Sequence, residues 1–267
     1  MASSTRQSLA SASKALEPML GKVDLVFAKQ LFAVAGAVSE SAQLRNLLSD
    51  PSAEAGAKSG AAKAVFGKTI AADALEFVTS LVALRWSRGS DLVSAIQDLA
   101  VQVVANLAAK NGSLEALEGE LFTFQQAVEG ESALQFALAN QQATLEARTA
   151  LVNKLLSGNA TAEGQLLITE ALGATKHERY SHVLERFGKL VSAVAKRSVA
   201  KVTVASELSP AQQERLTQAL SKQYGVQIKL NLEIDPSIVG GVRVQIADEI
   251  IDGSLVSRLQ QAKLQLA

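Results

Sequence analysis

A strict alternation of apolar and polar residues runs through Val226-Gln227-Ile228-Lys229-Leu230-Asn231-Leu232-Glu233-Ile234. Successive side chains of a strand point to opposite faces, so this period of two predicts a strand with one buried face. Upstream, Ser209-Pro210-Ala211-Gln212 predicts a helix start with a serine cap, a first-turn proline and a capping-box glutamine. Downstream, Gly240-Gly241 precedes a second alternating segment, Val242 to Ile246. Residues 199–267 are therefore predicted to form a small α+β domain.

The expected order within this domain is strand, helix, strand, strand, helix, with one face of the sheet covered. Val202 and Val204 alternate with polar neighbours and mark the first strand. Ala247-Asp248-Glu249 is interpreted as a tight turn that leads into Ile250-Ile251. The last helix is expected to start near residues 252–254. It would carry Leu255, Leu259 and Leu266.

Before about Arg197 the apolar residues recur with the period of a helix, and the breaks between the periodic segments are short. Ser4 and Gln7 predict a capping box at the first helix, and Gly21 can end that helix. The expected helices cover residues 4–20, 23–38, 42–48, 54–66, 72–85 and 91–109. Short connections favour antiparallel neighbours, so the fold class is mostly α, with tandem antiparallel bundles before the α+β domain.

The helical region looks duplicated with an offset of 90 residues. Gln30-Leu31-Phe32-Ala33 aligns with Glu120-Leu121-Phe122-Thr123, and the apolar positions and helix breaks that follow also align. The alternative is that any two helical bundles look this similar. The predicted domains are a first helical bundle at 1–110, a second bundle at 111–198 that would be its duplicate, and the α+β domain at 199–267. The second bundle lacks a first helix of its own unless the helix ending near Ala109 serves both.

The composition excludes several classes of function. Among 267 residues, 26 are basic and 26 acidic, so the chain lacks the basic footprint of a nucleic-acid binder. It has no cysteine and two histidines, which excludes thiolate metal sites and disulfides. Lys29 and Glu40 flank the apolar run from Leu31 to Val38, and this run is too short to span a membrane. We therefore expect a soluble chain without a signal peptide, which reaches a membrane only through a partner.

The candidate catalytic motifs in this sequence do not have the residue spacing that their chemistry requires. Gly67-Lys68-Thr69 ends like a phosphate-binding loop, but Ala62 stands where that loop needs glycine. His177 and His182 are five residues apart, which places them on different faces of a helix. Asp248, Glu249 and Asp252 are more typical of turns and helix caps than of a carboxylate site. We predict no catalytic residue, no metal and no cofactor. Trp86 is interpreted as a core anchor, with an interface contact as the alternative.

The stretch from Ile234 to Leu259 resembles the C-terminal signature of the δ subunit of bacterial F-type ATP synthases, the counterpart of the mitochondrial oligomycin-sensitivity-conferring protein. The residues that fit the signature are Gly240, Gly241, Asp248, Ile250, Ile251, Asp252, Ser254, Arg258 and Leu259. Ala247 stands where the family usually has glycine. Ordinary members carry one helical bundle, so two bundles would make this chain a long form.

The resemblance implies a stator without catalytic activity, on the cytoplasmic face of the bacterial cell membrane. The helical region would bind N-terminal segments of the α subunits, and the C-terminal domain would bind the b subunits of the peripheral stalk. Which bundle binds the α subunits stays open. The residues suggested for partner contacts are Trp86, Leu255, Leu259, Lys263 and Leu266. The alternative function is a non-enzymatic tandem helical adaptor unrelated to ATP synthase.

Overall fold

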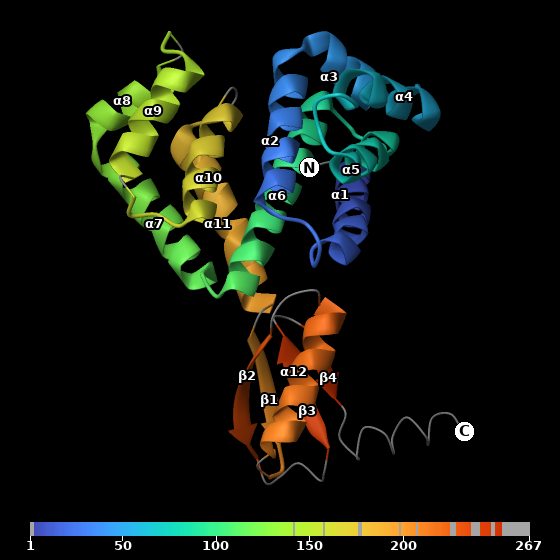
Figure 1. Ribbon diagram of the computed structural model, residues 1–267, viewed down its shortest axis with the longest axis vertical. Coiled ribbons are helices and arrows are strands. Elements are labelled where there is room, and N and C mark those ends of the chain that lie inside the picture. Colours follow the sequence, from blue (N-terminus) through green and yellow to red (C-terminus); the bar gives the residue numbers. More distant parts are fainter. Residues whose placement is uncertain are drawn as a thin grey trace. The chain divides into compact units, whose positions relative to one another are not determined.

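The computed structural model describes residues 3–140, 142–156, 158–175, 178–197, 199–206, 208–224, 228–235, 241–246 and 249–252. The chain divides into two compact units, Met1–Val191 and Ser192–Ala267. The first unit is helical, and the second contains a small mixed sheet (Figure 1). The predicted fold class, helical bundles followed by a small α+β domain, is therefore confirmed.

Eleven α-helices and two 3-10 turns are described from Ser3 to Arg197. They are α1 (Ser3–Leu16), η1 (Glu17–Met19), α2 (Leu25–Glu40), α3 (Ala42–Ser49), α4 (Ala55–Phe66), α5 (Ala72–Ala83), α6 (Gly89–Asn111), α7 (Leu114–Gly130), α8 (Ser132–Ala139), α9 (Leu145–Leu156), α10 (Ala162–Glu170), η2 (Ala171–Ala174) and α11 (Tyr180–Arg197). The predicted bounds of the first six agree within a few residues. The capping box at Ser4 is wrong, because Ser4 lies inside α1 and its hydroxyl contacts Ser87 Oγ at 2.6 Å.

Helix α6 forms the centre of the helical unit. It packs along α2 and also contacts α1, α3, α7 and α10. By length and composition α6 could cross a membrane, but 83% of its apolar window is buried by the rest of the chain. This burial is typical of a core helix. The helix ends where Gly112 adopts a positive φ of 75° and donates its N–H to the Ala108 and Ala109 carbonyls.

The element bounds repeat along the chain with the offset expected from the sequence. Helices α3 and α8 differ by 90 residues at both ends, and so do α4 and α9. Helix α11 begins 91 residues after α6. The segment 90 residues after α1 lies within α6. We call α1–α6 the first bundle, and the C-terminal half of α6 with α7–α11 the second bundle.

Three hydrogen bonds recur at the same offset. They are Ala71 N to Gln30 Oε1 (3.1 Å) and Thr161 N to Glu120 Oε1 (2.8 Å); Arg45 Nη1 to the Ser39 carbonyl (2.8 Å) and Gln135 Nε2 to the Glu129 carbonyl (2.9 Å); and Ser52 N to Asp50 Oδ1 (2.8 Å) and Gln142 N to Asn140 Oδ1 (3.0 Å). A generic likeness between bundles gives no reason for side chains at equivalent positions to bond equivalent atoms. The recurrence supports a duplication in which α6 serves both bundles.

The second unit is built around β1 (Val199–Val204), α12 (Pro210–Tyr224), β2 (Lys229–Ile234), β3 (Val242–Ile246) and β4 (Glu249–Asp252). The strand order is β2-β1-β3-β4, with β1 parallel to β2 and antiparallel to β3. The capping box before α12 is confirmed. Ser209 N donates to Gln212 Oε1 at 2.9 Å, and Gln212 N donates to Ser209 Oγ at 3.3 Å.

One face of the sheet carries the core of this unit. The buried side chains include Ala200, Val202 and Val204 of β1, Val244 and Ile246 of β3, Leu220 of α12, and Ile228 just before β2. Helix α12 lies across the sheet in Figure 1. Of the strand predicted at residues 226–234, residues 229–234 form β2, and β2 is an edge strand. Its apolar face is therefore only partly covered, and Ile234 at its end stays exposed.

The predicted order of elements needs one correction. Residues 249–252 form a fourth strand, where the sequence analysis expected a turn to lead directly toward the last helix. Ile250 and Ile251 pair with Gln245 and Val244 of β3, and two β-branched residues favour such a pairing. The last helix itself was expected in a segment outside the described residues.

Candidate partner-binding site

Two grooves of similar size lie at equivalent places in the helical unit. The groove of the second bundle has a volume of about 650 Å³, and α8 and the start of α11 form its walls. The groove of the first bundle has a volume of about 640 Å³, and α3 and the start of α6 form its walls. Arg45 and Arg88 line the first groove, and their repeat counterparts Gln135 and Arg179 line the second. Both volumes lie within the range of about 300–1,000 Å³ that is usual for binding clefts.

The two grooves differ in part of their lining. Arg186 of the second bundle helps to line the groove of the first, whereas Glu178 lines both grooves. In the second groove Phe136 of α8 is 76% exposed. Aromatic side chains are enriched at protein interfaces, so Phe136 marks this groove as a candidate contact surface.

A buried polar network joins the two bundles. Arg186 of α11 donates from Nη1 to Asp98 Oδ1 and from Nη2 to Gln97 Oε1 at 3.2 Å, both on α6. Its Nε also lies 3.6 Å from Glu178 Oε2. Burial raises the pKa of Asp98 to about 6, against the opposing effect of the Arg186 charge. Arg186 therefore compensates a carboxylate that would otherwise be costly to bury.

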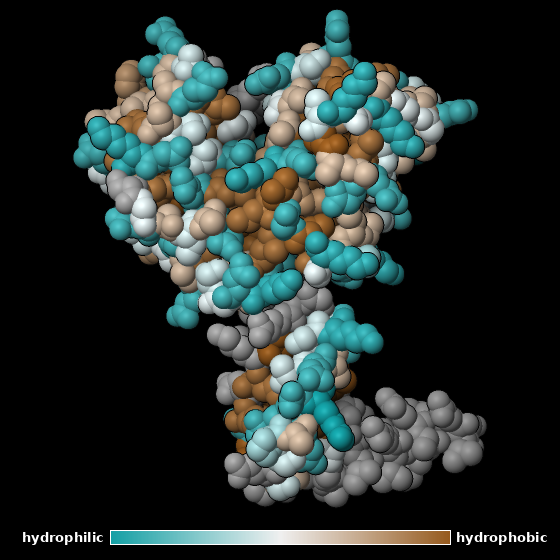
Figure 2. Space-filling view, in the orientation of Figure 1, coloured by the Kyte–Doolittle hydropathy of each residue, from teal (hydrophilic) through white to brown (hydrophobic). Residues whose placement is uncertain are grey.

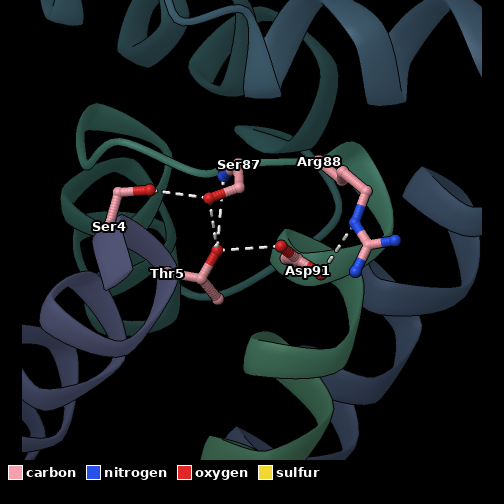
Figure 3. Close-up of polar contacts among 5 residues, drawn as sticks. All are labelled: Ser4, Thr5, Ser87, Arg88 and Asp91. Carbon is pink, nitrogen blue, oxygen red and sulfur yellow. Dashed lines mark hydrogen bonds and ion pairs between the residues drawn. The ribbon is translucent and has the colours of Figure 1, made fainter. Parts of the chain in front are cut away.

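Helix α1 is held to the α5–α6 connection by hydroxyl groups (Figure 3). Thr5 is fully buried, and its Oγ1 lies 2.8 Å from Asp91 Oδ2 and 3.0 Å from Ser87 Oγ. Arg88 adds an ion pair with Asp91 at 3.7 Å. Asp91 is in the first turn of α6, where a negative charge is also favoured by the helix dipole. These contacts fix the N-terminal helix on the first bundle.

These features of the helical unit were not predicted from the sequence. The sequence shows that Arg179 occupies the position equivalent to Arg88 in the repeat. The Arg186–Asp98 pair, by contrast, joins residues 88 positions apart and has no local sequence motif. Phe122 and Phe136 were visible as aromatic residues in a stretch without basic residues. Only the structure shows that both are exposed. Figure 2 shows further apolar surface where α2 and α6 lie in Figure 1.

The prediction that Trp86 could contact a partner is corrected. Its side chain is 1% exposed, and its Nε1 donates to the Leu81 carbonyl at 2.9 Å. A partner cannot reach an indole in this position. Trp86 is the core anchor that the sequence analysis preferred, and its polar atom is satisfied within the bundle.

Only some of the residues that fit the family signature lie within the described part of the chain. Gly241 has a φ of 89° immediately before β3, a conformation that favours glycine. The backbone of Asp252 pairs with Arg243 at the end of β4. The other predicted residues, Gly240, Asp248, Ser254, Leu255, Arg258, Leu259, Lys263 and Leu266, lie outside the described residues. Their roles stay predictions.

We expect Gly241→Val to destabilise the second unit by about 1–3 kcal/mol, because a β-branched side chain is strained at positive φ. Denaturant unfolding of the full chain, followed by a probe in residues 192–267, measures this effect. Gly36→Ala is the control, because a Cβ at this helical glycine meets nothing within 4 Å. Equal stability of the Gly241→Val variant and the parent would contradict the backbone role of Gly241.

The described residues contain no group of three or more His, Cys, Asp or Glu side chains able to hold a metal ion. Gly67 ends α4 and donates its N–H to the Lys63 carbonyl, so Gly67-Lys68 is a helix terminus and not a phosphate loop. Glu249 Oε2 accepts a hydrogen bond from the Tyr224 hydroxyl at 2.8 Å. These contacts have ordinary structural explanations.

Glu170, at the end of α10, provides a pH-dependent test of the helical unit. Burial raises its pKa to about 7 from the ordinary 4.5, with Lys29 opposing. The folded state therefore holds this proton more tightly, and stability falls as pH rises from about 4.5 through 7. We expect Glu170→Gln to stabilise the protein by about 1–2 kcal/mol at pH 8, a value discounted because the residue is half-buried, and to be neutral at pH 4. Thermal unfolding of this variant and of Glu146→Gln, an exposed control, would test it; equal curves at pH 8 would contradict it.

A comparison with known protein families identifies the family of this chain. The sequence profile described as "ATP synthase delta (OSCP) subunit" matches residues 101–266. The chain belongs to the ATP synthase delta (OSCP) family. The resemblance of residues 234–259 to this family is thereby confirmed, and the chain is a subunit of the peripheral stalk of ATP synthase.

Relatives in the delta family match along the whole chain. The ATP synthase subunit delta of Arthrobacter sp. (strain FB24) is 37% identical over 275 residues and covers 100% of both chains. That of Kineococcus radiotolerans is 40% identical, covering 98% of this chain and 96% of the relative. That of Leifsonia xyli subsp. xyli is 37% identical and covers 100% of both. The length of this chain is therefore shared by delta-family members.

The delta-family profile begins within α6. It therefore spans the second bundle and the second unit, whereas most of the first bundle precedes it. This start point agrees with the view that α6 supplies the first helix of the second bundle. The residues before 101 match in the full-length relatives.

Proposed function

We propose that this chain acts as the two-ended link of the stator, with the helical unit bound to the α/β head and the second unit bound to the b subunits. The observation that carries the proposal is membership of the delta family together with the division of the chain into two compact units. A link that resists torque needs a separate binding surface at each end. Two units with their own cores can provide such surfaces.

The helical unit is suited to bind N-terminal segments of the α subunits as helices. Amphipathic helices bind proteins by placing apolar side chains at i, i+3, i+4 and i+7 into an apolar groove. The groove of the second bundle carries the exposed Phe136, and further exposed apolar side chains lie on α2 and α7. The groove of the first bundle is lined mainly by polar and charged side chains and is less suited to this mode of binding. The Phe136 groove and the exposed apolar side chains support a head contact through this unit.

The second unit is suited to bind the distal ends of the b subunits. Ile234 and Ile250, on the two edge strands, are 56% and 60% exposed, so apolar surface is available at both edges of the sheet. Leu255, Leu259, Lys263 and Leu266 are the further contact residues expected from the sequence. We place the chain on the cytoplasmic face of the bacterial cell membrane, held there by the b subunits, and without catalytic activity of its own.

Binding of the head can be tested by calorimetry of the full chain with a peptide from the N-terminus of the α subunit of the same organism. We expect saturable binding of the peptide to the helical unit. A peptide of the same composition in scrambled order is the control, because it keeps the charge and loses the amphipathic spacing. Absence of binding, or equal binding of both peptides, would contradict the head contact.

A further inference from the structure

The groove of the first bundle brings cationic and hydroxyl-bearing side chains together between α3 and the start of α6. It has a volume of about 640 Å³, and its lining includes Arg45, Arg88, Arg186, Ser90 and Ser94. A guanidinium group presents several N–H donors in a planar fork, and a serine hydroxyl adds another donor. Donors of this kind, gathered in one cavity, suit a ligand that carries several negatively charged oxygens.

Arg45 of α3 is positioned over the first residue of α6. Its Nη1 donates to the Ser39 carbonyl at 2.8 Å. Its aliphatic stem lies against Gly89, where a Cβ atom would come within 2.5 Å of Arg45 Cγ and 3.1 Å of Ser49 Oγ. Gly89 therefore leaves the space that Arg45 needs to reach the end of α6. A larger residue at this position would force the arginine away from the groove.

The positive charges of this groove are not fully compensated. Arg186 is already paired with two carboxylates. Arg88 is 73% exposed and pairs with Asp91 at 3.7 Å, while the other oxygen of Asp91 accepts a hydrogen bond from Thr5 at 2.8 Å (Figure 3). Within the described part of the chain, Arg45 forms no ion pair. One guanidinium charge thus has no counter-ion, and a second is paired only at the surface.

The backbone of α6 adds donors at the same place. Gly89 and Ser90, the first two residues of this 23-residue helix, line the groove. Among the described residues no side chain caps the helix at Arg88, whereas Asp24 caps α2 and Ser41 caps α3. Free N–H groups in the first turn of a long helix carry partial positive charge and favour anions. They reinforce the arginine side chains that line the groove.

The equivalent groove of the second bundle has a different chemistry. Gln135 takes the place of Arg45, and the exposed Phe136 lies beside it. Tyr180, the first residue of α11, stands 91 positions after Gly89, the first residue of α6. The unpaired arginine and the glycine beneath it therefore belong to the first bundle alone. The two copies have diverged, and the first suits a small anion better than an apolar side chain.

We propose that the groove of the first bundle binds a phosphate-bearing anion, held by Arg45, Arg88 and the N-terminus of α6. Arginine matches phosphate geometry because two parallel N–H groups can reach two phosphate oxygens. The ligand chemistry is the phosphate group, supplied by inorganic phosphate, pyrophosphate or a nucleoside diphosphate, and the volume lies in the range of clefts that hold small molecules. The site does not depend on the stator contacts proposed above, because those use other surfaces.

Glu178 restricts where the anion lies. It lines the same groove, and its Oε2 is 3.6 Å from Arg186 Nε. Because like charges repel, the anion lies toward Arg45 and Arg88 and away from this carboxylate. Glu178→Gln should therefore strengthen phosphate binding about threefold. A groove whose charged residues serve only to hold the fold would show no such gain.

The test is calorimetric titration of the full chain with inorganic phosphate, pyrophosphate and ADP at constant ionic strength. We expect saturable binding, tighter for the two diphosphates because they offer more oxygens. Arg45→Gln and Arg88→Gln should each weaken binding about tenfold, because each removes charge-assisted hydrogen bonds. Gly89→Ala should weaken it as well, because the added Cβ displaces Arg45. Arg179→Gln, the same substitution at the repeat position equivalent to Arg88, should leave binding unchanged.

Two further comparisons complete the test. Adenosine, which lacks phosphate, should not bind; equal affinities for pyrophosphate and ADP would assign the site to the phosphate groups alone, and tighter binding of ADP would assign it to a nucleotide. Thermal unfolding without ligand should show that Arg88→Gln is folded, because this side chain is 73% exposed. No saturable binding by the parent, equal binding by the parent and Arg88→Gln, or an equal loss in Arg179→Gln would overturn the proposal.

Discussion

Removal of residues 199–267 should abolish binding to the b subunits and leave binding of the α-subunit peptide within a factor of about two. The reason is that the helical unit and the second unit form separate compact units, with the division at Val191 and Ser192. The truncation leaves α1 to α11 complete, including the buried contacts of Arg186 with α6. Pull-down with the b subunits and calorimetry with the α-subunit peptide give the two readings.

The truncated chain needs a folding control before the loss is interpreted. Its helical content and its cooperative thermal unfolding should match those of the helical unit in the full chain. Loss of both contacts by a folded truncation would show that the division of binding between the two units is wrong. Retention of b-subunit binding would show that the second unit does not carry the stalk contact.

Replacement of Arg186 by methionine should destabilise the helical unit by about 3–5 kcal/mol at pH 8, the cost of leaving a buried carboxylate without its partner. The Asp98 side chain is 7% exposed and that of Arg186 is 24% exposed, so solvent compensates little of this loss. Methionine keeps most of the aliphatic volume, so the variant removes the charge and its hydrogen bonds.

The effect of Arg186→Met should depend on pH in a defined direction. The pKa of Asp98 is already raised to about 6 by burial, and loss of the arginine raises it further. The folded state then holds the Asp98 proton more tightly than the unfolded state, so the variant loses stability as pH rises from about 4 upward. At pH 5, where Asp98 is mostly protonated, we expect a loss of only about 1–2 kcal/mol.

Lys189→Met is the matched control for this prediction. Lys189 lies three residues further along α11 and pairs with Glu185 at 2.6 Å, but its side chain is 74% exposed. An exposed helical pair contributes about 0.3–0.5 kcal/mol, so this variant should unfold close to the parent at both pH values. Equal stability losses for the two variants would contradict the role assigned to the Arg186–Asp98 pair.

Local sequence patterns predicted helices and strands well where capping residues or a clear periodicity mark the element. Ser209-Pro210 starts α12 as expected, and the helix expected at residues 42–48 is found as α3 at Ala42–Ser49. The fourth strand was missed because Ile250-Ile251 is too short to show a period, and its pairing with β3 is a tertiary contact. Ser4 was misassigned because its hydroxyl bonds a residue 83 positions away.

The candidate site was less predictable than the fold. The apolar pattern of the sequence repeats with an offset of 90 residues, but the sequence does not say which of two equivalent faces is covered. Phe32 and Phe122 are the same residue type at equivalent positions, yet one is 4% exposed and the other 64%. The difference arises from the packing of α11 on the first bundle, which no local pattern encodes.

The central claim is that the two units of this chain bind different parts of one ATP synthase. The most direct measurement is chemical cross-linking with mass spectrometry on the complex purified from native membranes of the organism that encodes the chain. We predict cross-links from Lys29 or Lys63 of the helical unit to the α subunits, and from Lys201 or Lys222 of the second unit to the b subunits. Absence of the chain from the purified complex, or cross-links from both units to the same subunit alone, would contradict the claim.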